Sequence, residues 1–151
     1  MPPAGARDDN EMSRSVEELN RRMLRVRDAM DRAYAQPLDI PALAAIASVS
    51  EAHFIRTFSA TFGETPHRYL QRRRVERAMY LLRASDRAVT DVCFDVGFSS
   101  LGTFSRIFRE IVAESPTDYR RRGPIVPVPN CFAMAWTRPS SFGEAGTSKG
   151  G

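Results

Sequence analysis

The stretch VTDVCFDVGFSSLGTFSRIFREIV, residues 89–112, decides the fold of this chain. Its first part has the spacing of a short helix that ends at Gly97, and Ser99 or Ser100 is placed to cap a second helix. Phe104 and Phe108 recur at helical spacing and are predicted to belong to a core. A short helix, a tight turn and a longer helix together make a helix-turn-helix unit.

The same pattern occurs earlier in the chain. The matches at an offset of 49 are Leu43, Ala44, Ala47, Val49 and Ser50 with Val92, Cys93, Val96, Phe98 and Ser99. At an offset of 50 they are Phe54, Arg56, Phe58, Pro66 and Tyr69 with Phe104, Arg106, Phe108, Pro116 and Tyr119. The change of offset places one extra residue in the second turn. Residues 39–63 and 89–113 are therefore predicted to be two copies of one helix-turn-helix unit.

Other helical signals surround these two units. Apolar residues at spacings of three and four predict an amphipathic helix over residues 15–35, with Ser15 and Glu18 as its capping box. A longer helix over residues 65–84 follows the first unit. Before residue 124, no stretch alternates apolar and polar residues over the length of a β-strand. We expect an all-α fold of about seven helices, in which two helix-turn-helix subdomains are joined by a long linker helix.

The two ends of the chain differ in composition from the part between them. Residues 1–13 contain two prolines and a glycine and show no apolar periodicity, so a disordered leader is expected. Residues 123–151 form a tail rich in proline and glycine, in which residues 131–136 are apolar enough to dock on the domain or on a partner. The domain itself is expected to span residues 14–122.

Length, composition and charge restrict the class of protein. The 151 residues are enough for one ordinary domain or two very small ones that share a core, and 42% hydrophobic and 26% charged residues are typical of a soluble globular protein. The net charge is +4, and Lys149 is the only lysine among 22 basic residues, so arginine, which suits phosphates and guanine, dominates. A GC-rich genome would produce the same bias. The sequence shows no signal peptide and no apolar run long enough for a membrane span, so a cytoplasmic, nucleoid-associated protein is expected.

The sequence shows no constellation of catalytic or metal-binding residues. His53 and His67 are isolated, and Cys93 and Cys131 have no second pair, so neither a zinc site nor a disulfide framework is predicted. No Ser/His/Asp or Cys/His spacing suggests nucleophilic catalysis. We therefore expect no enzyme activity, no metal and no cofactor.

An arginine occupies the same place in both predicted second helices. Arg56 and Arg106 each come two residues after a core phenylalanine, on the side that faces away from the first helix. A second helix of this kind can enter the DNA major groove, where arginine reaches guanine edges or phosphate. Two units in adjacent grooves must lie about 34 Å apart, one DNA turn, or else bend the DNA. The duplication lets one copy occupy two half-sites, so a monomer is sufficient.

At these residues the sequence resembles the DNA-binding domain of the AraC/XylS family of bacterial transcription regulators. The resemblance covers about residues 17–122. It is most specific in DVGFSSLGTFSRIFREIVAESPTDYRRR, residues 95–122, which is similar to the family's Gly-Phe, hydroxyl-rich turn, Phe-Ser-Arg-x-Phe and Ser-Pro-x-x-Tyr-Arg signature. It implies two recognition helices. The positions implied as base-reading are Ala52, Ile55 and Arg56 in the first unit and Leu101, Gly102, Ser105 and Arg106 in the second.

The predicted phosphate contacts combine a basic stretch after the first unit with residues near the second helices. Arg72, Arg74 and Arg77 are expected to face outward from the helix over residues 65–84, where they can fix the register on a duplex. The alternative for this basic stretch is a solvated helix face that does not contact DNA. For residues 120–122, the alternative to phosphate contact is a favourable interaction with a helix dipole. The candidate phosphate contacts are Arg68, Arg72, Arg74, Ser50, Ser100, Thr103, Arg109 and Arg120.

Several positions depart from the family's pattern. Four of the implied base readers, Ala52, Ile55, Leu101 and Gly102, cannot hydrogen-bond to bases through their side chains, although apolar side chains can contact thymine methyls. Direct readout is then left to the two arginines and Ser105. Ala113 stands where the family usually has a glycine that closes the second recognition helix, so an altered helix end is expected.

The sequence thus predicts a sequence-specific transcription regulator that binds double-stranded DNA with both recognition helices in adjacent major-groove segments. Family members commonly carry an effector-binding or dimerisation domain, for which this chain has no room, so it resembles the short stand-alone form or a fragment of a longer regulator. The alternative is a protein-interaction module that binds RNA polymerase or a separate sensor subunit and retains only residual DNA affinity. The missing polar readers favour this alternative.

Overall fold

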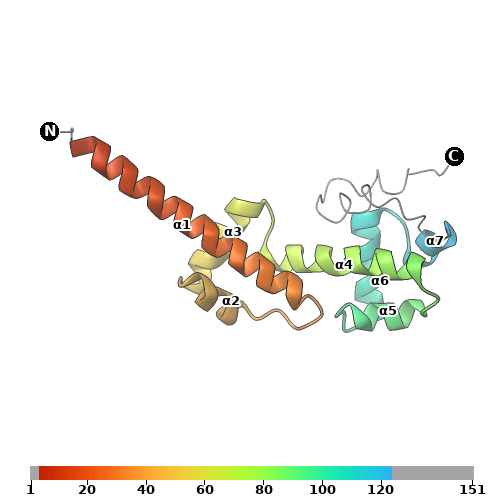
Figure 1. The fold of residues 1–151 in the computed structure, drawn as a ribbon. Helices are drawn as coiled ribbons and strands as arrows, with labels where there is room; N and C mark the ends of the chain where they lie inside the picture. Colours follow the sequence, from red (N-terminus) through yellow and green to blue (C-terminus); the bar gives the residue numbers. More distant parts are fainter. Residues whose placement is uncertain (1–3, 124–151) are drawn as a thin grey trace. The chain divides into compact units, whose positions relative to one another are not determined.

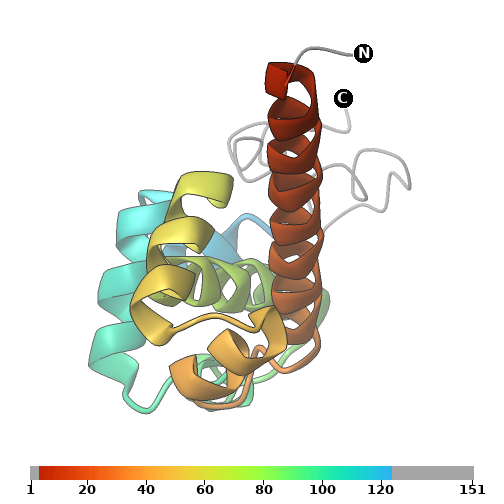
Figure 2. The same ribbon diagram turned by 90° about the vertical axis from the view of Figure 1, so that its left-hand side faces the viewer.

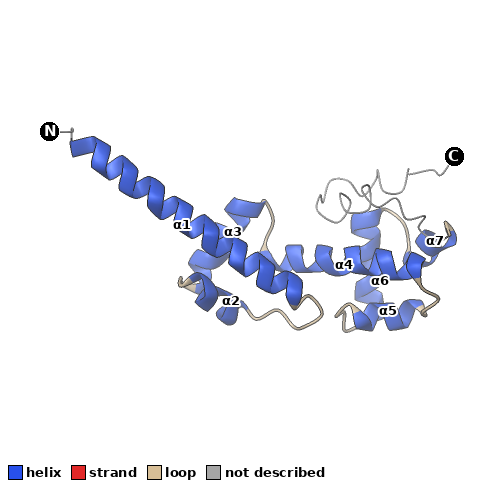
Figure 3. Cartoon of the chain, in the orientation of Figure 1, coloured by secondary structure: helices blue, strands red, loops and turns tan. Residues whose placement is uncertain are grey.

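The computed structural model describes residues 4–123, and every regular element in that range is an α-helix (Figure 1, Figure 3). In chain order the helices are α1 (Ala4–Arg32), α2 (Ile40–Ala47), α3 (Glu51–Phe62), α4 (Pro66–Ala84), α5 (Val89–Asp95), α6 (Leu101–Val112) and α7 (Pro116–Arg121). The prediction of an all-α fold with about seven helices is confirmed. None of these helices is long and apolar enough to cross a lipid bilayer. The predicted tail lies, apart from Gly123, outside the described residues.

Contacts between residues divide the chain into two compact units, one ending at Leu70 and the other beginning at Gln71. The first unit contains α1, α2, α3 and the first residues of α4. The second contains the remainder of α4 with α5, α6 and α7. Each unit therefore holds one of the two predicted helix-turn-helix pairs.

In the first unit, α2 and α3 lie beside the C-terminal half of α1 (Figure 2). Met23, Val26 and Met30 form a stripe at helical spacing on α1, and none of them is more than 4% exposed. Phe54 and Phe58 of α3 are completely buried in the same core. Because burial of such side chains contributes about 1.5–3 kcal/mol each, this apolar cluster is what fixes the first unit.

The start of α4 is tied to α1 and α3 within the first unit. The ring of Tyr69 lies edge-on to that of Phe58, with centroids 5.6 Å apart. Its hydroxyl donates a 2.7 Å hydrogen bond to Oδ1 of Asp31 on α1. One residue thus anchors α4 through both a ring contact and a polar contact.

α1 begins at Ala4 instead of near residue 15, so residues 4–13 of the expected disordered leader are helical. All side chains described before Glu18 are exposed, so packing does not explain this extension. Once the packed turns have formed, each further residue adds a backbone hydrogen bond without a new nucleation cost, and Ala, Arg, Glu and Met are good helix formers. Ser15 therefore lies inside the helix and not at its cap, and Glu18 pairs with Arg22 at 3.2 Å.

The second unit repeats the aromatic arrangement of the first. The rings of Phe108 and Tyr119 lie edge-on with centroids 5.7 Å apart, as the equivalent rings of Phe58 and Tyr69 do. Phe104 lies between Phe108 and Phe98, at centroid distances of 5.6 and 5.2 Å. These contacts join α6 to α7 and to the turn before α6, so the repeat in sequence is a repeat in packing.

The charged face of α4 differs from the expectation. Arg72 was predicted to face outward, but its side chain is only 14% exposed and contacts Oε1 of Glu76 at 2.6 Å. Arg73 contacts Oε2 of the same carboxylate at 2.6 Å. Glu76 itself is 4% exposed. A buried carboxylate requires hydrogen-bonding partners, and this requirement draws both arginines inward.

Candidate nucleic-acid interface

The two helix-turn-helix turns share one hydrogen-bonding scheme. In the first turn, Val49 N donates to Ala44 O at 3.2 Å. In the second, Phe98 N donates to Cys93 O at 3.1 Å, which is the same bond at an offset of 49. Such a bond back into the preceding helix is how a helix end satisfies carbonyls that have no partner within the helix. The two turns therefore begin with the same backbone hydrogen bond.

Each second helix is capped by a serine. Ser50 Oγ accepts a hydrogen bond from His53 N and Ser100 Oγ accepts one from Thr103 N, both at 3.2 Å. Ser100 is thus the equivalent of Ser50, and the predicted match of Ser50 with Ser99 is wrong. Ser99 is the extra residue of the second turn. From these caps onward, α3 and α6 match residue for residue at an offset of 50 and have 12 residues each.

Cys93 braces the second unit at its turn. It is completely buried, and its Sγ donates to Ser100 O at 3.5 Å. Burial raises the pKa of its thiol, because the thiolate would lose its contact with water. A thiol held in its protonated form at a helix crossing has a structural role.

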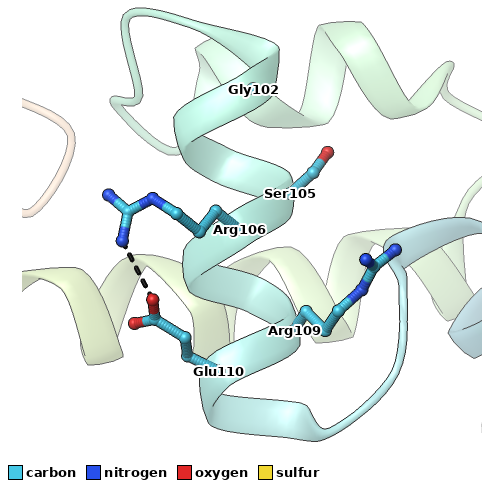
Figure 4. Close-up of a pocket in the computed structure, with 5 residues that line it drawn as sticks. All are labelled: Gly102, Ser105, Arg106, Arg109 and Glu110. Carbon is cyan, nitrogen blue, oxygen red and sulfur yellow. Dashed lines mark hydrogen bonds and ion pairs between the residues drawn. The ribbon is translucent and has the colours of Figure 1, made fainter.

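The outward face of α6 carries a shallow depression lined by five residues at helical spacing. These are Gly102, Ser105, Arg106, Arg109 and Glu110 (Figure 4). Three of the residues between them, Phe104, Ile107 and Phe108, are buried, and Thr103 is exposed. The depression therefore runs as a stripe along the solvent-facing side of the helix, of the kind that a DNA groove requires.

Arg106 does not project alone from this stripe. Its Nη1 donates a 2.9 Å hydrogen bond to Oε1 of Glu110, one helical turn further on (Figure 4). The side chains are 62% and 46% exposed. Glu110 was not among the predicted site residues, although its spacing of four from Arg106 is the usual signal for such a pair.

The outward face of α3 is formed by the equivalent positions. Ala52 and Arg56 are exposed, and Ile55 is 39% exposed although it is a large apolar residue. On α6, Leu101 is similarly 41% exposed. Six of the seven implied base readers are thus exposed, and Ser105 is half-buried. Their contact with bases remains a prediction.

The hydroxyl candidates for phosphate contact gather at the starts of the two second helices. Ser50, Ser100 and Thr103 are all exposed there. Ser100 Oγ donates to Thr103 Oγ1 at 2.8 Å in addition to its capping role. The first backbone amides of a helix carry partial positive charge and favour anions, so these positions remain suitable for phosphate.

Arg74 and Arg120, predicted to contact phosphate, both have inward contacts. The Arg74 guanidinium lies 5.8 Å from the centre of the Phe98 ring, and burial lowers its pKa. Arg120 Nε donates to Leu82 O at 2.9 Å, and its Nη2 donates to Arg87 O. Arg120 therefore ties α7 to the end of α4, and we reassign it to a structural role. Arg109, by contrast, is exposed on the α6 stripe.

Comparison with known sequences finds a match to a helix-turn-helix domain family over residues 43–122. The chain is 34% identical to the regulatory protein SoxS of Escherichia coli over 93 residues, which cover 62% of this chain and 87% of SoxS. It is 40% identical over 88 residues to the transcriptional activator RhaS of Klebsiella pneumoniae, which cover 58% of this chain and 32% of RhaS. It spans 28% of a Haemophilus influenzae transcriptional regulator.

Comparison with solved structures finds the same architecture. A probable AraC family transcriptional regulator from Rhodopseudomonas palustris has a TM-score of 0.64 at 26% identity, covering 69% of this chain and 98% of that one. The DNA-binding domain of the transcriptional factor AdpA, solved in complex with a target DNA, has a TM-score of 0.62 at 31% identity. That match covers 66% of this chain and 90% of the AdpA chain.

Proposed function

The chain belongs to the AraC/XylS family of DNA-binding transcription regulators, and we propose that it binds specific double-stranded DNA sequences through both α3 and α6. The family and the fold are those of transcription regulators and not of enzymes. AdpA, a neighbour in structure, was solved with a target DNA. Duplex DNA is therefore the partner that we assign to this chain.

One observation carries the proposal: the chain contains two helix-turn-helix units that share the hydrogen bond at the start of the turn, the serine cap and an arginine at the same outward position. Arg56 and Arg106 both lie six residues after the capping serine, on exposed faces. A second unit retained only for packing would not need to keep this arginine. Arginine at such a position donates two hydrogen bonds to O6 and N7 of guanine.

The remaining residues of the stripes are assigned by their chemistry. Ile55 and Leu101 contact thymine methyl groups, and Ser105 hydrogen-bonds to a base edge. Ala52 and Gly102 allow the helix backbone to approach the base pairs. The capping hydroxyls and first amides of α3 and α6, together with Arg109, contact phosphates and set the register.

We propose that the two units occupy successive major-groove segments of one site. α4 contributes residues to both units, so a single chain supplies both recognition helices. The expected site then has two short blocks about one DNA turn, or about 10 base pairs, apart. One copy fills both blocks, so binding of a monomer is expected.

The test is selection of bound duplexes from a random library, with affinities for the selected and random duplexes measured at two salt concentrations. We expect two enriched sequence blocks. The chain should still bind the selected duplexes more tightly than random DNA at the higher salt, because base contacts depend less on counterion release than phosphate contacts do. Binding that depends on salt and selects no motif would overturn the proposal of sequence specificity.

Single substitutions then assign the blocks. Arg56→Ala and Arg106→Ala should each lower affinity for the selected site by about 1–3 kcal/mol and relax one base position, in different blocks. Arg25→Ala is the matched control, because it removes the same charge from an exposed position on α1. Equal losses on selected and random DNA for Arg106→Ala would contradict its base-reading role.

The alternative of a protein-interaction module is not favoured by the family to which the chain belongs. The apolar segment at residues 131–136, on which it partly depended, lies outside the described residues. RNA polymerase as a further partner stays a prediction. Deletion of residues 124–151 distinguishes the two functions, because it should leave DNA binding intact and, under the alternative, abolish binding of the protein partner.

A further inference from the structure

The outward stripes of α3 and α6 share one charged residue and differ at the other four positions. The stripe of α3 consists of Ala52, Ile55, Arg56, Ser59 and Ala60, and that of α6 of Gly102, Ser105, Arg106, Arg109 and Glu110. The arginine is common to both. The residue one turn after it is Ala60 in the first unit and Glu110 in the second. The two arginines therefore have different neighbours although their backbone positions are equivalent.

This difference changes what holds each guanidinium. Arg106 Nη1 donates to Oε1 of Glu110 at 2.9 Å. The Arg56 side chain makes no hydrogen bond or ion pair within residues 4–123. A free arginine samples many rotamers, so its guanidinium must be ordered when DNA binds. Arg106 is already directed along the helix surface.

We propose that Glu110 is a specificity-determining residue that positions Arg106 for a guanine, an inference that rests on the proposed function. A guanidinium has five N–H donors, and Glu110 occupies one of them through Nη1, so others remain for O6 and N7 of guanine. The carboxylate also repels the phosphate backbone, which makes non-specific contacts of this stripe less favourable. Glu110 therefore reduces affinity for all DNA and increases discrimination at one base pair.

The first unit has no equivalent of this arrangement. Arg56 can turn toward guanine or toward phosphate, because no carboxylate follows it at a spacing of four. We expect the block read by α6 to be more strictly defined at its arginine position than the block read by α3.

The test uses the full chain and four variants: Glu110→Ala, Arg106→Ala, their double variant and Ala60→Glu. Affinities are measured for the selected duplex, its single-base-pair substitutions and random duplexes at two salt concentrations. Ala60→Glu is the reciprocal of Glu110→Ala, because it places a carboxylate one turn after Arg56. The Arg106–Glu110 pair is exposed, so thermal unfolding of all variants should match that of the parent chain.

Glu110→Ala is expected to bind random DNA more tightly, with a steeper salt dependence. It should lose about fivefold of its preference at the base pair that Arg106→Ala also relaxes. The double variant should discriminate no worse than Arg106→Ala alone, because a positioning residue acts only through the residue that it positions. Ala60→Glu should sharpen the preference at the Arg56 position and weaken random binding.

The outcomes separate this inference from the proposed function. If the parent chain selects no motif, the proposed function fails first. If it selects a motif and Glu110→Ala keeps the full preference, only the positioning role is overturned. A further loss at a different base pair in the double variant would mean that Glu110 contacts a base directly, as a carboxylate can with N4 of cytosine, and would also overturn the positioning role.

Discussion

Ala113 ends α6 in the same left-handed conformation in which Gly63 ends α3. The backbone angles are φ 68°, ψ 13° at Ala113 and φ 75°, ψ 7° at Gly63. Each amide donates to the carbonyl four residues earlier, Arg109 O and Ser59 O respectively, at 2.9 Å. The altered helix end expected from an alanine at residue 113 is therefore not found. The second unit keeps the conformation and bears the strain of a side chain in it.

Ala113→Gly should raise the free energy of unfolding by about 0.5–1 kcal/mol, because glycine adopts a positive φ without steric cost. Gly63→Ala should lower it by a similar amount. A Cβ at residue 63 would meet no atom within 4 Å, so only backbone strain is tested there. Urea unfolding measures both changes, and a stability loss in Ala113→Gly would contradict the argument.

Glu76 should make the chain less stable as the pH rises. Burial raises the pKa of this carboxyl, because loss of water outweighs the attraction of Arg73 and Arg72. The folded protein then holds the proton to higher pH than the unfolded chain does. The free energy of unfolding therefore falls as the pH rises from the ordinary value of 4.5 through the raised pKa. Glu76→Gln cannot titrate and should remove this part of the slope in urea unfolding at a series of pH values.

Glu18→Gln is the control for that measurement, because its effect has the opposite sign. The hydrogen bond from Arg22 lowers the pKa of Glu18, so the stability that it contributes is present above 4.5 and lost as the pH falls. Identical pH profiles for the parent chain and Glu76→Gln would show that Glu76 does not titrate as stated.

Arg120→Ala should reduce stability and leave the salt dependence of DNA binding unchanged. Its guanidinium donates to Leu82 O and Arg87 O, and loss of such bonds costs about 1–3 kcal/mol when acceptors remain unsatisfied. Thermal unfolding measures the loss of stability, and DNA titrations at several salt concentrations measure the salt dependence of binding. A flatter salt dependence without loss of stability would restore the original assignment to phosphate.

Arg109→Ala should show the reverse behaviour. Its side chain lies on the exposed stripe of α6 and makes no hydrogen bond or ion pair within the described part of the chain. We expect binding to selected and random duplexes to weaken alike and the salt slope to fall by about 1, with unchanged stability. A loss confined to one base position would instead make Arg109 a base reader.

Removal of residues 1–14 should change the free energy of unfolding by less than about 0.5 kcal/mol, because the described side chains there are exposed. Met23→Ala, at a completely buried position of the same helix, should cost about 2–5 kcal/mol. Circular dichroism of the truncated chain should show the loss of helix without a change in the unfolding midpoint. A large shift of the midpoint would indicate packing of this end.

The sequence by itself determined the features that depend on near neighbours. The serine at the start of α3 and the Gly63 end are set by residue type over one helical turn, and the buried faces by periodicity. The repeat, and with it the equivalence of Arg56 and Arg106, was readable in the same way. Only the placement of the extra residue at Ser99 required the structure, because two adjacent serines satisfy the capping pattern equally well.

The tertiary structure alone decided which charges face outward. Arg72 and Arg120 belong to basic stretches that suggest a solvated surface. The spacing of four between Arg72 and Glu76 allows their pairing, but only the fold shows that this pair is buried. Arg120 bonds to a carbonyl 38 residues away. A long arginine side chain can reach a buried polar group that needs a hydrogen-bonding partner, even when that group is distant in the sequence. The extension of α1 over the expected leader has a related cause. The packed half of α1 supplies the helix nucleus, so the exposed half forms without a new nucleation cost. No local pattern in residues 4–13 indicates this.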